Sequence, residues 1–275
     1  MNRIEELFNR LAGGNEKALV IYLMAGDPDI ETTGKLLKTI QKAGADIIEV
    51  GIPFSDPMAD GPTIQRAACR ALEKEVTLTQ VLEMITELKD ELTVPIVLFG
   101  YYNPIFSYGP KKFASDAAKA GVDGVLVVDL PPEEKHELTR FTEKEGIQFI
   151  TLVSPVSGGE RLAGIIEESR GFLYYVSVTG VTGARESLPE ELLGDIGMIK
   201  EMSTLPVAVG FGVSNPEMAS MLGSVADGVV VGSALVDIIE KNGANKKRLL
   251  GEVEGFVSSL KSALVYDESR AKTSG

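Results

Sequence analysis

The sequence predicts an α/β fold, a single-domain (βα)8 TIM barrel with an extra N-terminal helix. Eight short apolar runs alternate with amphipathic helical stretches along the whole chain of 275 residues. Continuous apolar strands joined through helices indicate a parallel sheet covered on both faces, and eight such units in this length fit a closed barrel. A weak repeat agrees, because KAGADIIEV, KAGVDGVLVV and SVADGVVV share a helix end, an Asp and a strand. A doubly wound open sheet is the alternative fold.

The predicted strands are short and apolar, as strands buried on both faces must be. They are Leu19–Met24, Ile47–Val50, Pro95–Phe99, Gly124–Val128, Ile147–Val153, Phe172–Val178, Pro206–Gly210 and Gly228–Gly232. The N-terminal helix, about residues 2–12, carries Ile4, Leu7, Phe8 and Leu11 at helical spacing.

Several of the other predicted helices have recognisable ends. Asp29 can cap a helix that ends at Gly44. The pairs Thr77–Gln80 and Ser214–Glu217 have the spacing of capping boxes. Further helices are expected from Thr63, over Lys111–Ala120, Glu133–Glu145, Arg161–Ser169 and Glu190–Met202, and over about 246–264.

Composition limits the classes of protein that are possible. Apolar residues make up 44% of the chain, and the net charge of −13 argues against nucleic acid and an anionic membrane as partners. The N-terminus lacks the apolar core of a signal peptide and no apolar stretch could span a membrane, so we expect a cytoplasmic protein. No linker divides residues 1–275, which predicts one domain with a frayed tail after Lys272. The single cysteine, Cys69, is expected to pack in a helix.

Two acids stand where a barrel places its chemistry, at the carboxyl ends of strands. Glu49 ends the second apolar run and cannot ionise cheaply there without partners, while Asp60 follows on a loop rich in Pro, Gly and Ser. Two carboxyl groups in different environments are one way to run acid and base chemistry at neutral pH. The structural alternatives are a satisfied ion pair for Glu49 and a turn residue for Asp60.

Glycine-rich loops after the last strands predict a phosphate site. Gly210 and Gly212 follow the seventh strand, and Gly232-Ser233 opens a helix after the eighth. Free amides at a helix N-terminus suit an anion, and barrels commonly bind phosphate with these two loops. Gly183 in the sixth loop could add another amide. The alternative is that these glycines only turn the chain.

Other chemistries lack their residues. None of the eight strands contains Lys, so a Schiff-base aldolase has no obvious nucleophile. The only histidine, His136, lies in the charged stretch PPEEKHEL and is expected at the surface, which excludes a histidine-rich metal site. No P-loop or dinucleotide fingerprint is present. Carboxyl groups, tyrosines, backbone amides and an apolar pocket remain, and these can move protons on a phosphorylated substrate without a cofactor.

At this point the motifs carry a family resemblance. The segment EVGIPFSDPMADGPTIQ, Glu49–Gln65, closely resembles the signature of the tryptophan synthase alpha chain. The resemblance continues in order at Tyr102–Pro104, Asp129–Pro131, SVTGVTG, GFGVS and GSA, and it covers nearly the whole chain. Mild departures are Gly100, where a larger residue is usual, and Val128, which replaces a frequent proline. The first suggests a roomier pocket.

The resemblance implies a carbon–carbon lyase that cleaves indole-3-glycerol phosphate to indole and D-glyceraldehyde 3-phosphate by a retro-aldol step. It implies that Glu49 is the acid/base, that Asp60 takes or holds the proton of the indole nitrogen, and that Tyr174 positions the substrate. The phosphate would be held by Gly183, Gly210, Gly212, Gly232 and Ser233. The indole pocket would be walled by Tyr22, Ile64, Phe99, Leu126, Leu152, Thr182 and Phe211.

The resemblance also implies a partner and a cofactor outside this chain. The alpha chain docks on a PLP-dependent beta chain in an alpha2beta2 heterotetramer, and indole passes to it through a tunnel. The loop Pro53–Asp60 and the loop TGVTGARES would close the site and sense the partner. No cofactor or metal is expected in this chain. Two alternatives stay open: another phosphate-binding barrel enzyme, and a catalytically silent subunit that activates its partner.

Overall fold

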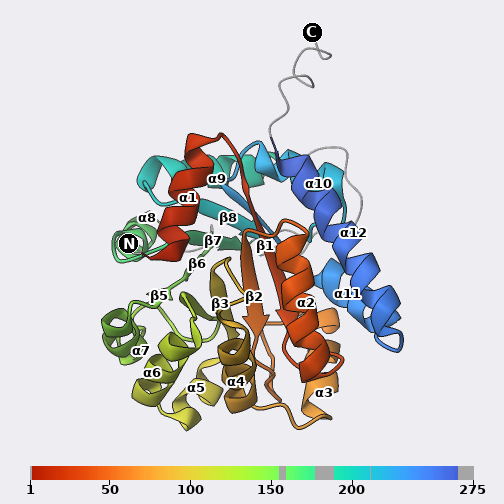
Figure 1. The fold of residues 1–275 in the computed structure, drawn as a ribbon. Helices are drawn as coiled ribbons and strands as arrows, with labels where there is room; N and C mark the ends of the chain where they lie inside the picture. The colour runs from red at the N-terminus through yellow and green to blue at the C-terminus, as the bar shows by residue number, and fades with distance from the viewer. Residues whose placement is uncertain (1, 155–158, 177–188, 211, 266–275) are drawn as a thin grey trace.

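The computed structural model describes residues 2–154, 159–176, 189–210 and 212–265 (Figure 1). Its strands form one sheet in the order β5-β4-β3-β2-β1-β9-β8-β7-β6, and every pairing is parallel. The strands are β1 Ala18–Met24, β2 Ile47–Gly51, β3 Ile96–Gly100, β4 Gly124–Val127, β5 Gln148–Phe149, β6 Thr151–Val153, β7 Leu173–Val176, β8 Val207–Gly210 and β9 Gly228–Val231.

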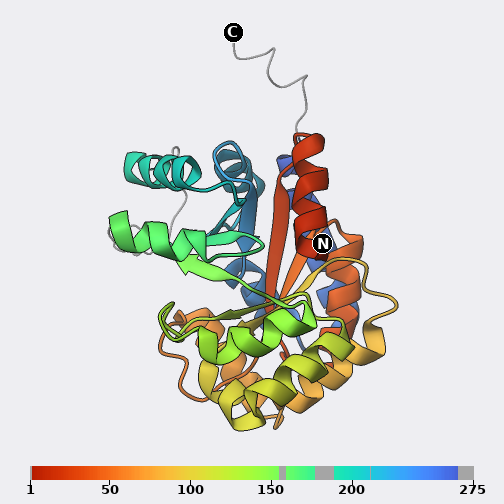
Figure 2. The ribbon, with the colours of Figure 1, turned by 90° about the vertical axis from the view of Figure 1, so that its left-hand side faces the viewer.

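The barrel closes through an interrupted fifth strand. β5 pairs with β4 and β6 pairs with β7, so the two short strands are the two ends of the predicted strand Ile147–Val153. Between them, the Ile150 N–H still donates to the Val125 carbonyl at 2.8 Å. In Figure 2 this green segment runs between the yellow-green helices and the green-to-cyan helices. The prediction of a (βα)8 barrel is confirmed, and the open sheet is excluded.

Helices cover the outer face of the sheet (Figures 1 and 2). They are α1 Arg3–Gly13, α2 Ile30–Lys42, α3 Pro62–Leu72, α4 Leu78–Leu88, α5 Tyr102–Tyr108, α6 Pro110–Ala120, α7 His136–Thr142, α8 Gly159–Glu167, α9 Glu190–Met202, α10 Pro216–Gly223, α11 Ser233–Asn242 and α12 Lys246–Leu264, with a 3-10 turn at Glu143–Glu145. Helix α7 is therefore shorter than the predicted helix Glu133–Glu145, and α5 was not predicted.

The predicted helix caps are partly right. The Asp29 side chain accepts the Thr32 N–H at 2.7 Å, and Thr77 and Gln80 form the expected capping box. The box at Ser214 is wrong. Helix α10 is capped by the next residue, Asn215, whose side chain accepts the Met218 N–H at 2.8 Å. Asn215 also precedes Pro216, which suits the first turn of a helix because its missing N–H would be unpaired there.

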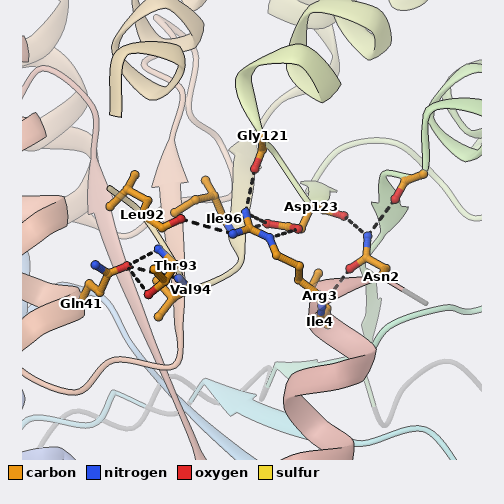
Figure 3. A network of polar contacts seen from close by, with 11 residues as sticks. Asn2, Arg3, Ile4, Gln41, Leu92, Thr93, Val94, Ile96, Gly121 and Asp123 are labelled. Carbon is orange, nitrogen blue, oxygen red and sulfur yellow. Dashed lines mark hydrogen bonds and ion pairs between the residues drawn. The ribbon is translucent and has the colours of Figure 1, made fainter. Parts of the chain in front are cut away.

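Helix α1 closes the end of the barrel where the strands begin. Ile4 and Phe8 are buried with the barrel interior, and the Phe8 ring lies 5.5 Å from that of Phe172. The Arg3 guanidinium donates two hydrogen bonds of 2.7 Å to the Asp123 carboxylate (Figure 3). It also donates to the Gly121 and Leu92 carbonyls, so α1 is fastened to two neighbouring strand entrances. The contacts at this end of the barrel therefore hold α1 against the strands.

Two further predictions concern single side chains. Cys69 lies in helix α3 but is exposed, because Ala67 and Ala68 take the buried face, so the prediction that it packs inside is wrong. His136 is exposed at the start of α7, as predicted.

Candidate active site

A cavity of about 180 Å³ opens at the carboxyl ends of the strands. It is lined by Tyr22, Asp60, Ile64, Phe99, Tyr174, Gly210, Gly212, Val213, Val230, Gly232 and Ser233. A larger cavity of about 270 Å³ lies around Asn2, Glu5 and Gln148, where strands begin. Because barrel enzymes place their chemistry at the carboxyl ends, the smaller cavity is the candidate active site.

Glu49 is buried in the barrel interior beside this cavity. Side chains alternate along β2, so Glu49 shares the inward face with Ile47 and pairs in register with Tyr22 of β1. The residue is 0% exposed, and neither carboxyl oxygen has a hydrogen-bond partner among the residues that the structure describes. Burial raises the pKa of Glu49 to about 8. This pKa favours the neutral acid at pH 7, and among the described residues Glu49 has no ion-pair partner.

Asp60 reaches the cavity from the loop that follows β2. Burial raises the pKa of this carboxyl group, and a hydrogen bond from the Tyr101 hydroxyl opposes that effect. The loop is fastened at its base by Gln65, whose side-chain amide donates to the Asp60 carbonyl at 2.9 Å. The two acids thus differ as the sequence suggested. Glu49 is fully buried without a partner among the described residues, whereas Asp60 lies at the rim, where Tyr101 acts on its pKa.

Two tyrosines, Tyr22 and Tyr174, lie close enough to the acids to feel their charges. Tyr22 and Phe99 meet edge to face with ring centroids 5.2 Å apart. Burial raises the pKa of Tyr22 well above its usual value, and the charges of Asp60 and Glu49 add to that rise. Burial and the Glu49 charge do the same for Tyr174. Both phenols therefore stay protonated and can act only as neutral hydrogen-bonding groups.

Glycines form the opposite wall of the cavity. Gly210, Gly212 and Gly232 all line it, and Gly212 has a φ of 62°, a conformation that favours glycine. Helix α11 begins at Ser233 with Gly232 as its N-cap, so the free amides of its first turn lie at the cavity. An amide-rich wall at a helix N-terminus suits an anion such as phosphate.

Some predicted residues lie elsewhere. Leu126 is fully buried, and Leu152 lines a separate cavity of about 220 Å³ beside Asp129. A side chain at Gly100 would point at Ile52, so its absence does not enlarge the cavity. Thr182, Gly183 and Phe211, with the loop TGVTGARES, lie outside the described residues.

The cavity also contains residues that the sequence reasoning missed. Val230 lines it two positions before Gly232, so strand alternation could have identified it. Val213 follows the glycine loop and carried no signal. Tyr101 does not line the cavity but interacts with Asp60 at its rim, and nothing in the sequence linked the two residues.

Two general features of the described residues complete the description. Among them, no three His, Cys, Asp or Glu side chains are grouped closely enough to hold a metal ion. No helix in the same part of the chain is both long and apolar enough to cross a membrane.

A parallel barrel with two carboxyl groups and an amide-rich cavity at the carboxyl ends of its strands defines an enzyme of the α/β-barrel class. Residues 8–265 match the family model described as tryptophan synthase alpha chain. The alpha chain of Citrifermentans bemidjiense is 51% identical over 266 residues, which are 96% of this chain and 98% of that protein. The alpha chain of Thermoanaerobacter sp. is 46% identical over 264 residues, 96% of this chain and all of that one.

Solved structures agree. The crystal structure of tryptophan synthase subunit alpha from Legionella pneumophila has a TM-score of 0.89 at 42% identity, covering 96% of this chain and 98% of that chain. The chain therefore belongs to the tryptophan synthase alpha chain family. Its activity is the lyase activity of the alpha subunit in tryptophan biosynthesis, in preference to another barrel reaction or a silent subunit.

Proposed function

We propose that Glu49 and Asp60 perform the acid–base cleavage of indole-3-glycerol phosphate in the cavity between Tyr22 and Ser233. The observation that carries the proposal is the fully buried Glu49 carboxyl group, which has no partner among the described residues and whose pKa of about 8 favours the protonated form at neutral pH. A buried neutral acid without partners costs stability, and such costs are typical of catalytic groups.

Glu49 can serve both proton transfers of a retro-aldol step. It first gives its proton to indole C3, which turns the ring into an electron sink. The resulting carboxylate takes the proton of the glycerol hydroxyl, and a carbonyl forms as the C–C bond breaks. The bonding electron pair returns to the ring, so indole and glyceraldehyde 3-phosphate leave with Glu49 protonated again. A pKa near the working pH makes both transfers accessible to one group.

Asp60 and Tyr174 would act on the ring from the side of the cavity. The Asp60 carboxylate would accept the indole N–H and stabilise the positive charge that develops there after C3 is protonated. Tyr174, neutral because its pKa is raised, would orient the substrate. Tyr22, Ile64 and Phe99 supply the apolar surface that a flat aromatic ring requires.

The phosphate would lie against Gly210, Gly212, Gly232 and Ser233. Helix α11 offers unpaired amides and a positive dipole end there. Binding energy from this remote group would hold the reacting carbon near Glu49. No cofactor is required in this chain for the proton transfers.

We also propose that the chain docks on a PLP-dependent beta chain in an alpha2beta2 heterotetramer, with the loop Pro53–Asp60 at the contact. Two large apolar side chains support this, because Met58 in that loop is 93% exposed and Phe106 in α5 is 63% exposed. Both belong to segments that follow barrel strands at their carboxyl ends, so a partner placed there would cover the cavity mouth.

The decisive experiment follows indole release from indole-3-glycerol phosphate, with and without a beta chain. We expect wild-type release to rise when the partner is added, and Glu49→Gln to abolish release while the fold and phosphate binding remain. Glu87→Gln on the exposed face of α4 is the matched control and should behave as wild type. Turnover by Glu49→Gln comparable with that of wild type would contradict the assigned role.

A further inference from the structure

The loop that carries Asp60 is held by one phenol from the neighbouring strand. Tyr101 directly follows β3 and is 4% exposed, so its ring is fixed by the barrel. The Phe54 ring, at the start of the loop, lies 5.2 Å from it. The Tyr101 hydroxyl accepts the Ala59 N–H at 2.9 Å, and it interacts with the Asp60 carboxyl group in the direction that lowers the pKa of that group. Two consecutive residues of the loop therefore depend on a single oxygen atom.

The chemistry of a phenol fixes the direction of hydrogen bonding at the Tyr101 oxygen. A phenol has one proton to donate, and a backbone N–H can only donate. Because Ala59 occupies an acceptor position of the Tyr101 oxygen, the phenol proton is free to point at Asp60. Burial and the Asp60 charge raise the pKa of Tyr101 to about 12, so the phenol keeps that proton throughout the neutral range. The bond consequently favours the ionised form of Asp60.

The rest of the loop has few contacts of this kind. Ser55, Asp56 and Met58 are exposed, and the Gln65 amide holds the backbone of Asp60 rather than its carboxyl group. From strand β1, Tyr22 is another titratable group whose pKa responds to Asp60, and the charge of Asp129 adds to the rise in the Tyr101 pKa. Among the described residues, Tyr101 is thus the group that holds the loop beside Asp60 and opposes the effect of burial on the Asp60 pKa.

We propose that Tyr101 is a positioning residue for the cleavage reaction, which holds the loop at Ala59 and thereby places the Asp60 carboxyl group at the cavity rim, where the phenol favours its ionised form. This inference rests on the proposed function of Asp60. Tyr101 touches the acid and the loop, whereas the cavity is lined by other residues, so it acts through Asp60. Loss of the hydroxyl alone should leave the ring packing against Phe54 and remove both hydrogen bonds at once.

The test compares Tyr101→Phe with Tyr102→Phe. The second variant is a matched control, since Tyr102 is the adjacent residue and its hydroxyl donates to Glu137, away from the cavity. For each protein, kcat and KM for indole-3-glycerol phosphate are measured from pH 5 to pH 9. We expect Tyr101→Phe to lower kcat at pH 6 about tenfold and to move the acidic limb of the kcat profile up by about one pH unit. Tyr102→Phe should match wild type.

A second readout does not depend on catalysis. In wild type the Ala59 amide is hydrogen-bonded, so its hydrogen exchange should accelerate at least tenfold in Tyr101→Phe and stay unchanged in Tyr102→Phe. An unchanged pH profile and unchanged Ala59 exchange would overturn the proposal. Faster exchange with an unchanged pH profile would overturn the part that concerns Asp60. Wild-type protein without any cleavage would count against the proposed function instead, while the exchange measurement would still decide whether Tyr101 tethers the loop.

Discussion

Replacing Glu49 by Gln should give a protein whose stability advantage over wild type grows as the pH rises, although the substitution removes catalysis. In the folded chain Glu49 keeps its proton up to about pH 8, whereas in the unfolded chain it loses the proton near the ordinary value of 4.5. Between these values the unfolded state binds fewer protons than the folded state. The stability of wild type therefore falls as pH rises through this window, and Gln, which does not titrate, avoids that loss.

The size of the effect follows from the width of the window. One pH unit corresponds to 1.36 kcal/mol, so the 2.5 units between pH 4.5 and pH 7 amount to about 3 kcal/mol at pH 7. At pH 8 the difference approaches about 5 kcal/mol and then levels off. Below pH 4.5 both states of wild type are protonated, and any remaining difference reflects the shape and hydrogen bonding of the amide alone.

The assay is urea unfolding of wild type and Glu49→Gln at pH 5, 6, 7 and 8, with circular dichroism as the signal. The quantity to follow is the difference in unfolding free energy between the two proteins as a function of pH. Glu87→Gln, on an exposed helix face, should show a nearly constant difference from wild type. A Glu49→Gln advantage that stays flat from pH 5 to pH 8 would refute the inference that Glu49 is neutral in the folded protein.

Two further substitutions test the surroundings of the site. Gly51→Ala would place a methyl group 2.4 Å from the Tyr22 hydroxyl, so we expect a loss of about 1–3 kcal/mol in unfolding free energy, partly recovered in the double variant with Tyr22→Phe. An equal loss in the single and double variants would contradict that clash. Arg70→Met would remove the bidentate partner of the buried Asp27, whose contacts are 2.7 and 2.8 Å, and should lower the unfolding free energy by about 3 kcal/mol. Arg66→Met, on the exposed side of the same helix, is the control and should lower it by under about 1 kcal/mol. Urea midpoints measure both, and equal losses for the two arginines would show that Asp27 does not need its partner.

The barrel and its two acids were predictable because both depend on local patterns. Apolar runs of strand length define the eight barrel positions, and the rule that chemistry lies at the carboxyl ends of strands selects Glu49 and Asp60. The interruption of the fifth strand at Ile150 was not predictable, since IQFITLV is apolar and continuous in sequence. Whether neighbouring strands pair along their whole length depends on tertiary geometry rather than on propensity.

Side chains that meet across loops were harder to predict. Leu152 lies near a strand end as the site residues do, yet it lines a different cavity, beside Asp129. Tyr101 reaches Asp60 only because the loop after β2 folds back toward β3, and nothing in residues 53–60 specifies that path. Exposed Cys69 shows the same limit, since a helical pattern fixes which residues share a face but a single small residue does not reveal which face is buried.

The repeat recognised in the sequence explains how the two ends of the barrel divide their tasks. In each copy the Asp before a strand exchanges two hydrogen bonds with the first or second residue of a neighbouring strand. The Asp N–H donates to the carbonyl of that residue, and the Asp carboxylate accepts its N–H. The three pairs are Asp46 with Leu19, Asp123 with Ile96 and Asp227 with Val207. Each carboxylate also binds a helix cation, respectively Lys261, Arg3 and Lys200.

These three acids contrast with Glu49. All three have both hydrogen-bond donors and a cation, at the ends where strands begin. In the part of the chain that the structure describes, Glu49 has neither, and it lies toward the ends where strands finish. Hydrogen bonds and a cation offset the cost of taking a carboxylate out of water, whereas a buried carboxyl group without partners lowers the stability of the fold. The chain therefore uses the same chemical group for opposite purposes, and the satisfied acids that fasten the strand entrances help the barrel tolerate one unsatisfied acid beside the cavity.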